Sequence, residues 1–177
     1  MTRLEDLGPR ICILGPSNSG KSTLATAIGD ACGLGVIHLD RLYHRPNTDW
    51  EPRPREEFVA LHDAAILGDR WVMDGNYSRL FPQRFARATG VILLDVPTST
   101  SLLRYFRRTL FEKERVGALD GRKDSLKWTM IHHVAVATRE NRRRYAELFG
   151  EIGLPKISLP SARAIAGFYR AERLRRA

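Results

Sequence analysis

A nine-residue glycine-rich run near the N-terminus constrains this chain more than any other feature. It fits the pattern G-x-x-x-x-G-K-[ST] at every fixed position and reads Gly15-Pro16-Ser17-Asn18-Ser19-Gly20-Lys21-Ser22-Thr23. An apolar segment, residues 10–14, precedes the run, and a helical pattern, residues 21–32, follows it. In that context the glycines permit a backbone path on which main-chain amides and the positive helix end converge on phosphate oxygens.

The run predicts a site for ATP with magnesium. Lys21 would place a compact cation against the β- and γ-phosphates, and the Ser22 hydroxyl would coordinate the metal. The structural alternative is a chance glycine-rich turn, and the adjacent Lys-Ser pair argues against it. Motors, switches, transporters and kinases all use this motif, so other segments must indicate the reaction.

Short apolar segments alternate with helical patterns along the rest of the chain. The apolar segments are residues 10–14, 36–39, 70–73, 91–94 and 156–159. The helical patterns are residues 21–32, 55–67, 79–88, 99–114, 124–149 and 161–175. The apolar segments are continuously apolar, which is typical of strands covered on both faces. We therefore predict a three-layer α/β fold around a parallel sheet, in a single domain over residues 1–177.

Aspartates follow three of the predicted strands, at Asp40, Asp74 and Asp95. Ligands of open α/β sheets bind at the carboxyl ends of the strands, where a carboxylate can hold magnesium through water. Asp74 and Asp95 compete for that role on pattern alone. Asp74 could instead cap a turn with the glycine that follows it, and Asp95 could brace the next helix.

Asp40 ends the second predicted strand. Its carboxylate could take a proton from an attacking hydroxyl or hold the acceptor by hydrogen bonds. His38 lies on the same face of that strand and is more readily interpreted as a hydrogen-bonded core histidine. Residues 41–52, which include Trp50, have no clean period, and we interpret them as either a substrate-side loop or a packed surface loop.

Positive charge gathers in the second part of the chain. Residues 1–100 hold 11 Lys and Arg against 12 Asp and Glu, whereas residues 101–177 hold 18 against 8. The resulting net charge of +10 in residues 101–177 indicates either an anionic partner or a solvated helix face. Phosphates of a small substrate, nucleic acid and a membrane surface all fit as that partner.

Arginines form two clusters in this basic part. The first is on the polar face of the predicted helix 99–114 and in the loop after it: Arg104, Arg107, Arg108 and Arg115. Such arginines can stabilise a transferring phosphoryl group, and glycines in residues 116–121 would let a lid move. The second cluster is Arg139, Arg142, Arg143 and Arg144. No aromatic side chains interleave it, so nucleic-acid binding is only weakly supported.

Cysteine content and hydropathy point to the cytoplasm. Cys12 and Cys32 are too few for a disulfide framework, and we interpret both as small buried hydrophobic residues. Residues 1–10 contain no apolar signal segment, and no apolar stretch approaches the length of a membrane span.

These segments together resemble the adenylate-kinase-related small kinases, above all the bacterial subgroup labelled DNA topology modulation proteins. The matching segments, across most of residues 10–110, are the phosphate loop, His38-Leu39-Asp40, the region of Trp50, Asp74–Arg79 and Leu94–Pro97. The resemblance implies a five-stranded sheet in the order 2-3-1-4-5. That order sets the third strand beside the phosphate loop and implies that Asp74, and not Asp95, is linked to magnesium.

The resemblance also implies a short lid, at about residues 104–125, where Arg104 and Arg108 close over the phosphates. It places Leu159, Pro160 and Ser161 against the nucleotide base. Adenylate kinases carry Asp-Gly-Phe-Pro-Arg where this chain has Asp-Gly-Asn-Tyr-Ser-Arg, so its arginine stands one residue later. We expect four residues to contact the acceptor: Asp40, Asp74, Tyr77 and Arg79.

Our leading hypothesis is an ATP-dependent phosphotransferase that uses ATP and Mg²⁺ and acts on a small molecule or nucleotide, as a monomer or homodimer. Its catalytic residues would be Lys21, Asp40, Arg104 and Arg108. The alternative is a regulatory ATPase of the same fold that associates with nucleic acid through the basic second part.

Overall fold

Five parallel strands form one sheet in the order β2-β3-β1-β4-β5 in the computed structural model, which describes residues 2–48, 50–97, 99 and 138–176. The strands are β1 (Arg10–Leu14), β2 (Gly35–His38), β3 (Trp71–Asp74), β4 (Gly90–Leu94) and β5 (Lys156–Leu159). Every neighbouring pair is parallel, and β1 lies between β3 and β4. The predicted sheet and its strand order are confirmed.

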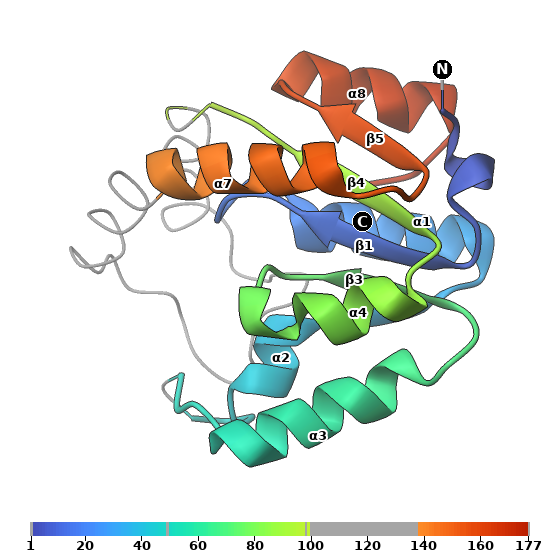
Figure 1. Ribbon diagram of the computed structural model, residues 1–177. Helices are drawn as coiled ribbons and strands as arrows, with labels where there is room; N and C mark the ends of the chain where they lie inside the picture. The colour runs from blue at the N-terminus through green and yellow to red at the C-terminus, as the bar shows by residue number, and fades with distance from the viewer. Residues whose placement is uncertain (1, 49, 98, 100–137, 177) are drawn as a thin grey trace.

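Helices cover both faces of the sheet, which confirms the three layers (Figure 1). One face carries α1 (Lys21–Cys32) and α8 (Ala162–Ala171). The other face carries α3 (Arg55–Ile66), α4 (Phe81–Arg87) and α7 (Thr138–Glu151). The shorter elements are α2 (Leu39–Tyr43) and two 3₁₀ turns, η1 (Leu4–Leu7) and η2 (Ser78–Leu80).

The central strand β1 contributes to the cores on both sides of the sheet. Ile11 and Ile13 pack under α1 and α8, whereas Cys12 and Leu14 pack on the opposite face. This division follows from the alternation of side chains along a strand. Cys12 is buried and Cys32 partly buried, and both thiols are free, as expected of small hydrophobic residues.

Two local predictions differ from the structure. The chain leaves β2 at His38, one residue earlier than predicted, and turns at once into α2, where we expected an irregular loop. Leu39 is fully buried at this turn, so tertiary packing overrides the weak local pattern. The predicted helix 79–88 divides into η2 and α4, with a proline in the first turn of α4.

Part of the predicted architecture lies outside the described residues. This holds for the helix 99–114 except residue 99, for the lid at about 104–125, and for the first half of the helix 124–149. The second half of that helix is α7, in which Tyr145 is buried. None of the helices that the structure describes has the length and apolar character of a membrane span.

Candidate functional site

The predicted phosphate loop connects β1 to α1 at the carboxyl edge of the sheet. Gly15 has a φ of +145°, and a Cβ atom there would lie 2.4 Å from the carbonyl oxygen of Leu94 on β4. Only glycine fits a position with both constraints. Asn18 also has a left-handed backbone, with φ +60°, and Gly20 ends the loop with φ +98° as the N-cap of α1.

The start of α1 is suited to an anion. Gly20 provides no side-chain cap, so the first-turn amides of α1 remain directed at the loop without a capping oxygen. The aligned peptide dipoles add partial positive charge at the same point. The local sequence therefore builds a positively polarised site at the start of α1 before any side-chain cation is counted.

Lys21 rests on the phosphate loop itself. Its Nζ donates to the Gly15 carbonyl at 2.9 Å and to the Pro16 carbonyl at 2.8 Å. Burial lowers the pKa of Lys21, and the carboxylates of Asp74 and Asp40 oppose that shift. Two of the predicted site carboxylates, Asp74 and Asp40, therefore lie near enough to act on this one ammonium.

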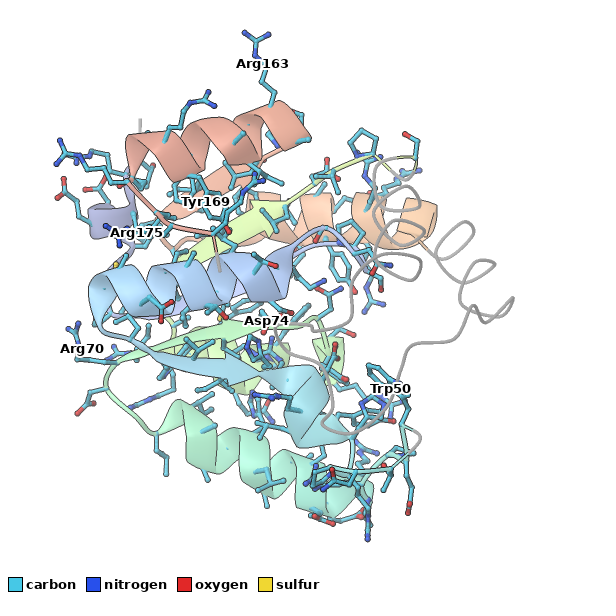
Figure 2. The ribbon with its side chains drawn as sticks, turned by 180° about the vertical axis from the view of Figure 1, so that it is seen from behind. Trp50, Arg70, Asp74, Arg163, Tyr169 and Arg175 are labelled. Carbon is cyan, nitrogen blue, oxygen red and sulfur yellow. The ribbon has the colours of Figure 1, made fainter. Side chains whose placement is uncertain are left out.

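Asp74 is held by two groups at the end of β3. The Ser22 hydroxyl donates to Asp74 Oδ2 at 2.7 Å, and His38 Nδ1 lies 2.6 Å from Asp74 Oδ1. The Asp74 and His38 side chains are only 6% and 9% exposed. Figure 2 shows Asp74 in the interior beside α1. His38 is thus a buried, partnered histidine, but its partner belongs to the candidate site.

The donor set around Asp74 fits magnesium. A hydroxyl and a carboxylate are hard oxygen ligands, and magnesium at phosphate sites is bound through one or two such groups together with phosphate oxygens and water. Within the described ranges, no group of three or more His, Cys, Asp or Glu side chains forms a metal cage. A metal at this position would therefore need further ligands, such as phosphate oxygens and water, beyond the described side chains.

Asp95, the competing carboxylate, is engaged elsewhere. Arg142 of α7 donates through Nε to Asp95 Oδ1 at 2.6 Å and through Nη2 to the Asp95 carbonyl at 3.4 Å. The contact joins the end of β4 to α7. Asp95 therefore braces α7, whereas the sequence suggested the next helix, 99–114, which lies outside the described residues except for residue 99.

The second carboxylate of the site is Asp40 on α2. The Tyr77 hydroxyl donates to Asp40 Oδ1 at 2.7 Å. Burial raises the pKa of Tyr77, and the neighbouring Asp40 carboxylate raises it further, so the phenol stays protonated and keeps donating. The turn after β3 therefore supplies a fixed donor to the carboxylate that follows β2.

A glycine lets these two segments approach. Gly75 has a φ of +120°, and a Cβ atom there would lie 2.8 Å from the Cβ of Leu39, the first residue of α2. Aromatic rings extend the contact outward: the Tyr77 and Tyr43 ring centroids are 5.1 Å apart, and Tyr77 and Phe58 are 4.9 Å apart. Trp50 lies at the outer edge of this region (Figure 2).

Two contacts around the turn after β3 were missed by sequence reasoning. The Asn76 side chain bonds to both main-chain groups of Gly15, and the fully buried Arg84 of α4 donates to the Gly75 carbonyl at 2.8 Å. Asn76 stands where adenylate kinases carry phenylalanine, and that departure was the available signal. Arg84 gave none, because an arginine in a helical pattern normally faces solvent.

The remaining predicted residues lie in different places. Arg79 is exposed, and no ion pair of it occurs in the described part of the chain. Leu159 is buried in the core and Pro160 is exposed, while the Ser161 hydroxyl accepts a hydrogen bond from the Ala164 amide and caps α8. The predicted lid arginines, Arg104 and Arg108, lie outside the described residues.

Comparisons with known proteins bear on the fold. No family model matches the chain, and no curated protein matches it in sequence. Shikimate kinase from Acinetobacter baumannii in complex with shikimate is similar in structure, with a TM-score of 0.55 and 15% identity over 94% of this chain and 92% of that chain. A gluconokinase from Sinorhizobium meliloti 1021 is also similar in structure, with a TM-score of 0.53 and 18% identity over 95% of each chain. The chain therefore has the three-layer α/β fold found in these small P-loop kinases.

Proposed function

We propose that the protein is an ATP-dependent phosphotransferase that acts on a small hydroxylated molecule or a nucleotide. One observation carries the proposal: the Ser22 hydroxyl meets the Asp74 carboxylate at 2.7 Å directly behind a complete phosphate loop. This is the pairing expected of a magnesium site that serves a bound triphosphate. Asp40 lies near enough to Lys21 to act on its charge, and we propose that the acceptor binds beside Asp40.

The phosphate loop binds and orients the triphosphate. Its main-chain amides and the start of α1 bind the phosphate oxygens, and Lys21 moves from its own loop carbonyls to the β- and γ-phosphates. Ser22 and Asp74 hold magnesium, which when bound neutralises charge on those oxygens. His38 fixes the carboxylate plane of Asp74 by bonding to its other oxygen.

Asp40 positions the acceptor. Tyr77 occupies Asp40 Oδ1, and among the described residues no hydrogen-bond donor meets the second oxygen. That oxygen is available to an acceptor hydroxyl, whose proton it can take as the phosphoryl group transfers. Arg79 is exposed after β3, and we propose that it meets an anionic group of the acceptor. The arginines proposed for the lid, Arg104 and Arg108, would neutralise the transferring group.

The comparisons support a small acceptor. The two similar structures are a shikimate kinase and a gluconokinase, and shikimate and gluconate are both compounds with several hydroxyl groups. The adenylate-kinase resemblance adds nucleotides as a second class. We propose that ATP and Mg²⁺ are used in either case, that the base lies near Leu159–Ser161, and that the protein works in the cytoplasm as a monomer or homodimer.

An ATP-consumption screen tests the proposal. Purified protein with magnesium and ATP is presented with sugars, hydroxy acids, nucleosides, nucleotides and DNA, and one small-molecule class is expected to raise ATP consumption. Lys21→Ala should lower the rate at least about 10³-fold, since it removes the cation on the transferring phosphates. The proposal fails if the variant retains wild-type turnover.

Lys156→Ala is a matched control for that substitution. Lys156 also donates its ammonium to main-chain carbonyls, those of Phe149, Gly150 and Ile152 at the end of α7 and just beyond it. It stands at the start of β5, away from the carboxyl edge of the sheet. Its loss should cost stability at α7 and leave turnover of the folded protein near the wild-type value.

A nucleic-acid-associated regulatory ATPase, as the DNA topology label suggests, is the second candidate. The net charge of +10 in residues 101–177 favours it. Two arginines of the second cluster already have carboxylate partners, since Arg142 pairs with Asp95 and Arg143 with Glu147. Stimulation by polynucleotide that falls steeply with added salt would identify this function in the same screen.

A further inference from the structure

The Asn76 side chain connects the turn after β3 to the first residue of the phosphate loop. Its Oδ1 accepts a hydrogen bond from the Gly15 amide at 3.2 Å, and its Nδ2 donates to the Gly15 carbonyl at 2.9 Å. One primary amide therefore meets both main-chain groups of one residue. A carboxylate could only accept and an ammonium could only donate, so asparagine is chemically suited to this position.

The bond to the Gly15 carbonyl has a second consequence. That oxygen also accepts from Lys21 Nζ at 2.9 Å. When Lys21 turns toward a triphosphate, the carbonyl loses this donor, and Asn76 remains bonded to it. The amide therefore keeps the carbonyl oriented and hydrogen-bonded in both positions of the lysine, which lowers the cost of releasing Lys21.

The turn that carries Asn76 is itself held in place by the side chain of Arg84. Arg84 is fully buried and donates through Nη1 to the Gly75 carbonyl at 2.8 Å and to the Asn76 carbonyl at 3.5 Å. Burying a guanidinium is costly, and burial indeed lowers the pKa of Arg84. The hydrogen bonds from Arg84 to the two carbonyls offset part of this cost and fix residues 75 and 76.

Tyr145 of α7 lies near the Asn76 side chain. Burial raises the pKa of the Tyr145 phenol, and the Asn76 side chain is among the groups that oppose this rise. Tyr145 is buried and packs edge-on against Phe81 of α4, with ring centroids 6.5 Å apart. Asn76 thus lies among three ordered groups, which restrict its rotamer.

From this geometry we infer that Asn76 is a positioning residue for nucleotide binding, which acts by holding Gly15 and with it the start of the phosphate loop. The inference rests on the proposed function, because it presumes that the loop binds a triphosphate. The next residue, Tyr77, holds Asp40 by its hydroxyl. A single turn therefore fixes the phosphate loop through one side chain and the acceptor carboxylate through the next.

The expected effect is a loss of affinity with little change in the chemical step. Without Asn76, the Gly15 amide and carbonyl must find other hydrogen-bond partners. Only a fraction of the molecules then has the loop conformation that binds the nucleotide. Apparent affinity falls by that fraction. Two hydrogen bonds to neutral groups support a decrease of roughly tenfold for Asn76→Ala.

Thr89→Val provides a matched control, because Thr89 bonds to the opposite end of β1, the strand that leads to Gly15. The Thr89 hydroxyl accepts from the Arg10 amide at 2.8 Å and donates to the Arg10 carbonyl at 3.1 Å. It thus makes at the first residue of β1 the same pair of bonds that Asn76 makes at the residue after β1. Valine removes both bonds with little change in shape, so the loss of stability should be similar to that of Asn76→Ala.

The experiment is calorimetric titration of wild type, Asn76→Ala, Asn76→Ser and Thr89→Val with magnesium and a non-hydrolysable ATP analogue, with a thermal melt of each. We expect about tenfold weaker binding for both Asn76 variants and unchanged affinity for Thr89→Val at a similar melting temperature. Asn76→Ser keeps the inference testable if the alanine variant does not fold, because a serine hydroxyl is too short to meet both Gly15 atoms.

The outcomes distinguish a failure of the proposed function from a failure of the positioning role of Asn76. If wild type takes up no analogue, the proposed function fails. If wild type binds and the folded Asn76 variants bind equally well, or if Thr89→Val weakens binding as much as they do, the positioning role is refuted and the proposed function stands. Once the acceptor is identified, the KM for ATP should rise about tenfold in Asn76→Ser while kcat stays within about twofold.

Discussion

Replacing Gly15 by alanine tests how tightly the phosphate loop is fitted to the sheet. The added methyl group would lie 2.4 Å from the Leu94 carbonyl oxygen, a contact that real Cβ atoms essentially never make, and 3.0 Å from the Leu94 Cβ, which is tighter than most real Cβ contacts. The backbone at Gly15 also has a φ of +145°, which alanine strongly disfavours. The substitution therefore combines a steric clash with backbone strain.

Both penalties can be estimated. Overpacking against a main-chain atom costs about 1–3 kcal/mol, and holding a residue with a Cβ in such a conformation costs about 1–3 kcal/mol more. The sum, about 4 kcal/mol, is a large share of a stability of about 5–15 kcal/mol. For a domain of this size it corresponds to a decrease in melting temperature of roughly 8–16 °C.

Gly33→Ala is the matched comparison. Gly33 caps the C-terminus of α1 with a φ of +62°, and no atom lies within 4 Å of the position that its Cβ would take. Alanine there adds backbone strain alone, about 1 kcal/mol, or roughly 2–4 °C. Differential scanning calorimetry of the two variants measures the difference. Equal decreases would refute the argument that the close approach to Leu94 requires glycine at position 15.

Two further predictions concern charge. Burial raises the pKa of the Cys12 thiol from 9.0 to about 12, so folding favours the neutral thiol. The contribution of this thiol to the free energy of unfolding is complete below pH 9 and is lost as the pH rises toward 12. We expect the free energy of unfolding to fall by about 1.4 kcal/mol more between pH 8 and pH 10 in wild type than in Cys12→Ala, measured by urea denaturation; equal slopes would contradict it. Asp74→Asn should weaken magnesium-dependent analogue binding at least about tenfold, whereas Asp95→Asn should lower only the melting temperature; a reversed order would assign the metal to Asp95.

Sequence patterns predicted the sheet well because they are local and repeated. Each strand is a short apolar run bounded by a turn, and the strand order followed from a resemblance carried by several motifs. The residues of the motif Gly15–Thr23 likewise predict the conformation of the loop without reference to other segments. Such features can be recognised without knowing which distant segments pack against them.

The parts that were missed depend on contacts between distant segments. α2 forms where Leu39 packs against Gly75, which is 36 residues away in the chain and is set beside it by strand pairing. Arg84 looks like any solvent-facing arginine until α4 packs and its guanidinium meets His62 of α3 and the Gly75 carbonyl. Asn76 was visible as a departure from the adenylate kinases, but its partner, Gly15, is identified only by the structure.

The division of β1 between the two cores also bears on how the molecule opens. The strand is paired on both edges and packed on both faces, so its amides cannot reach solvent unless both layers separate at once. Hydrogen exchange there should follow global unfolding, while helices at the periphery exchange sooner. The predicted phosphate loop therefore follows directly from the strand that is expected to exchange last, and local opening elsewhere leaves that strand in place.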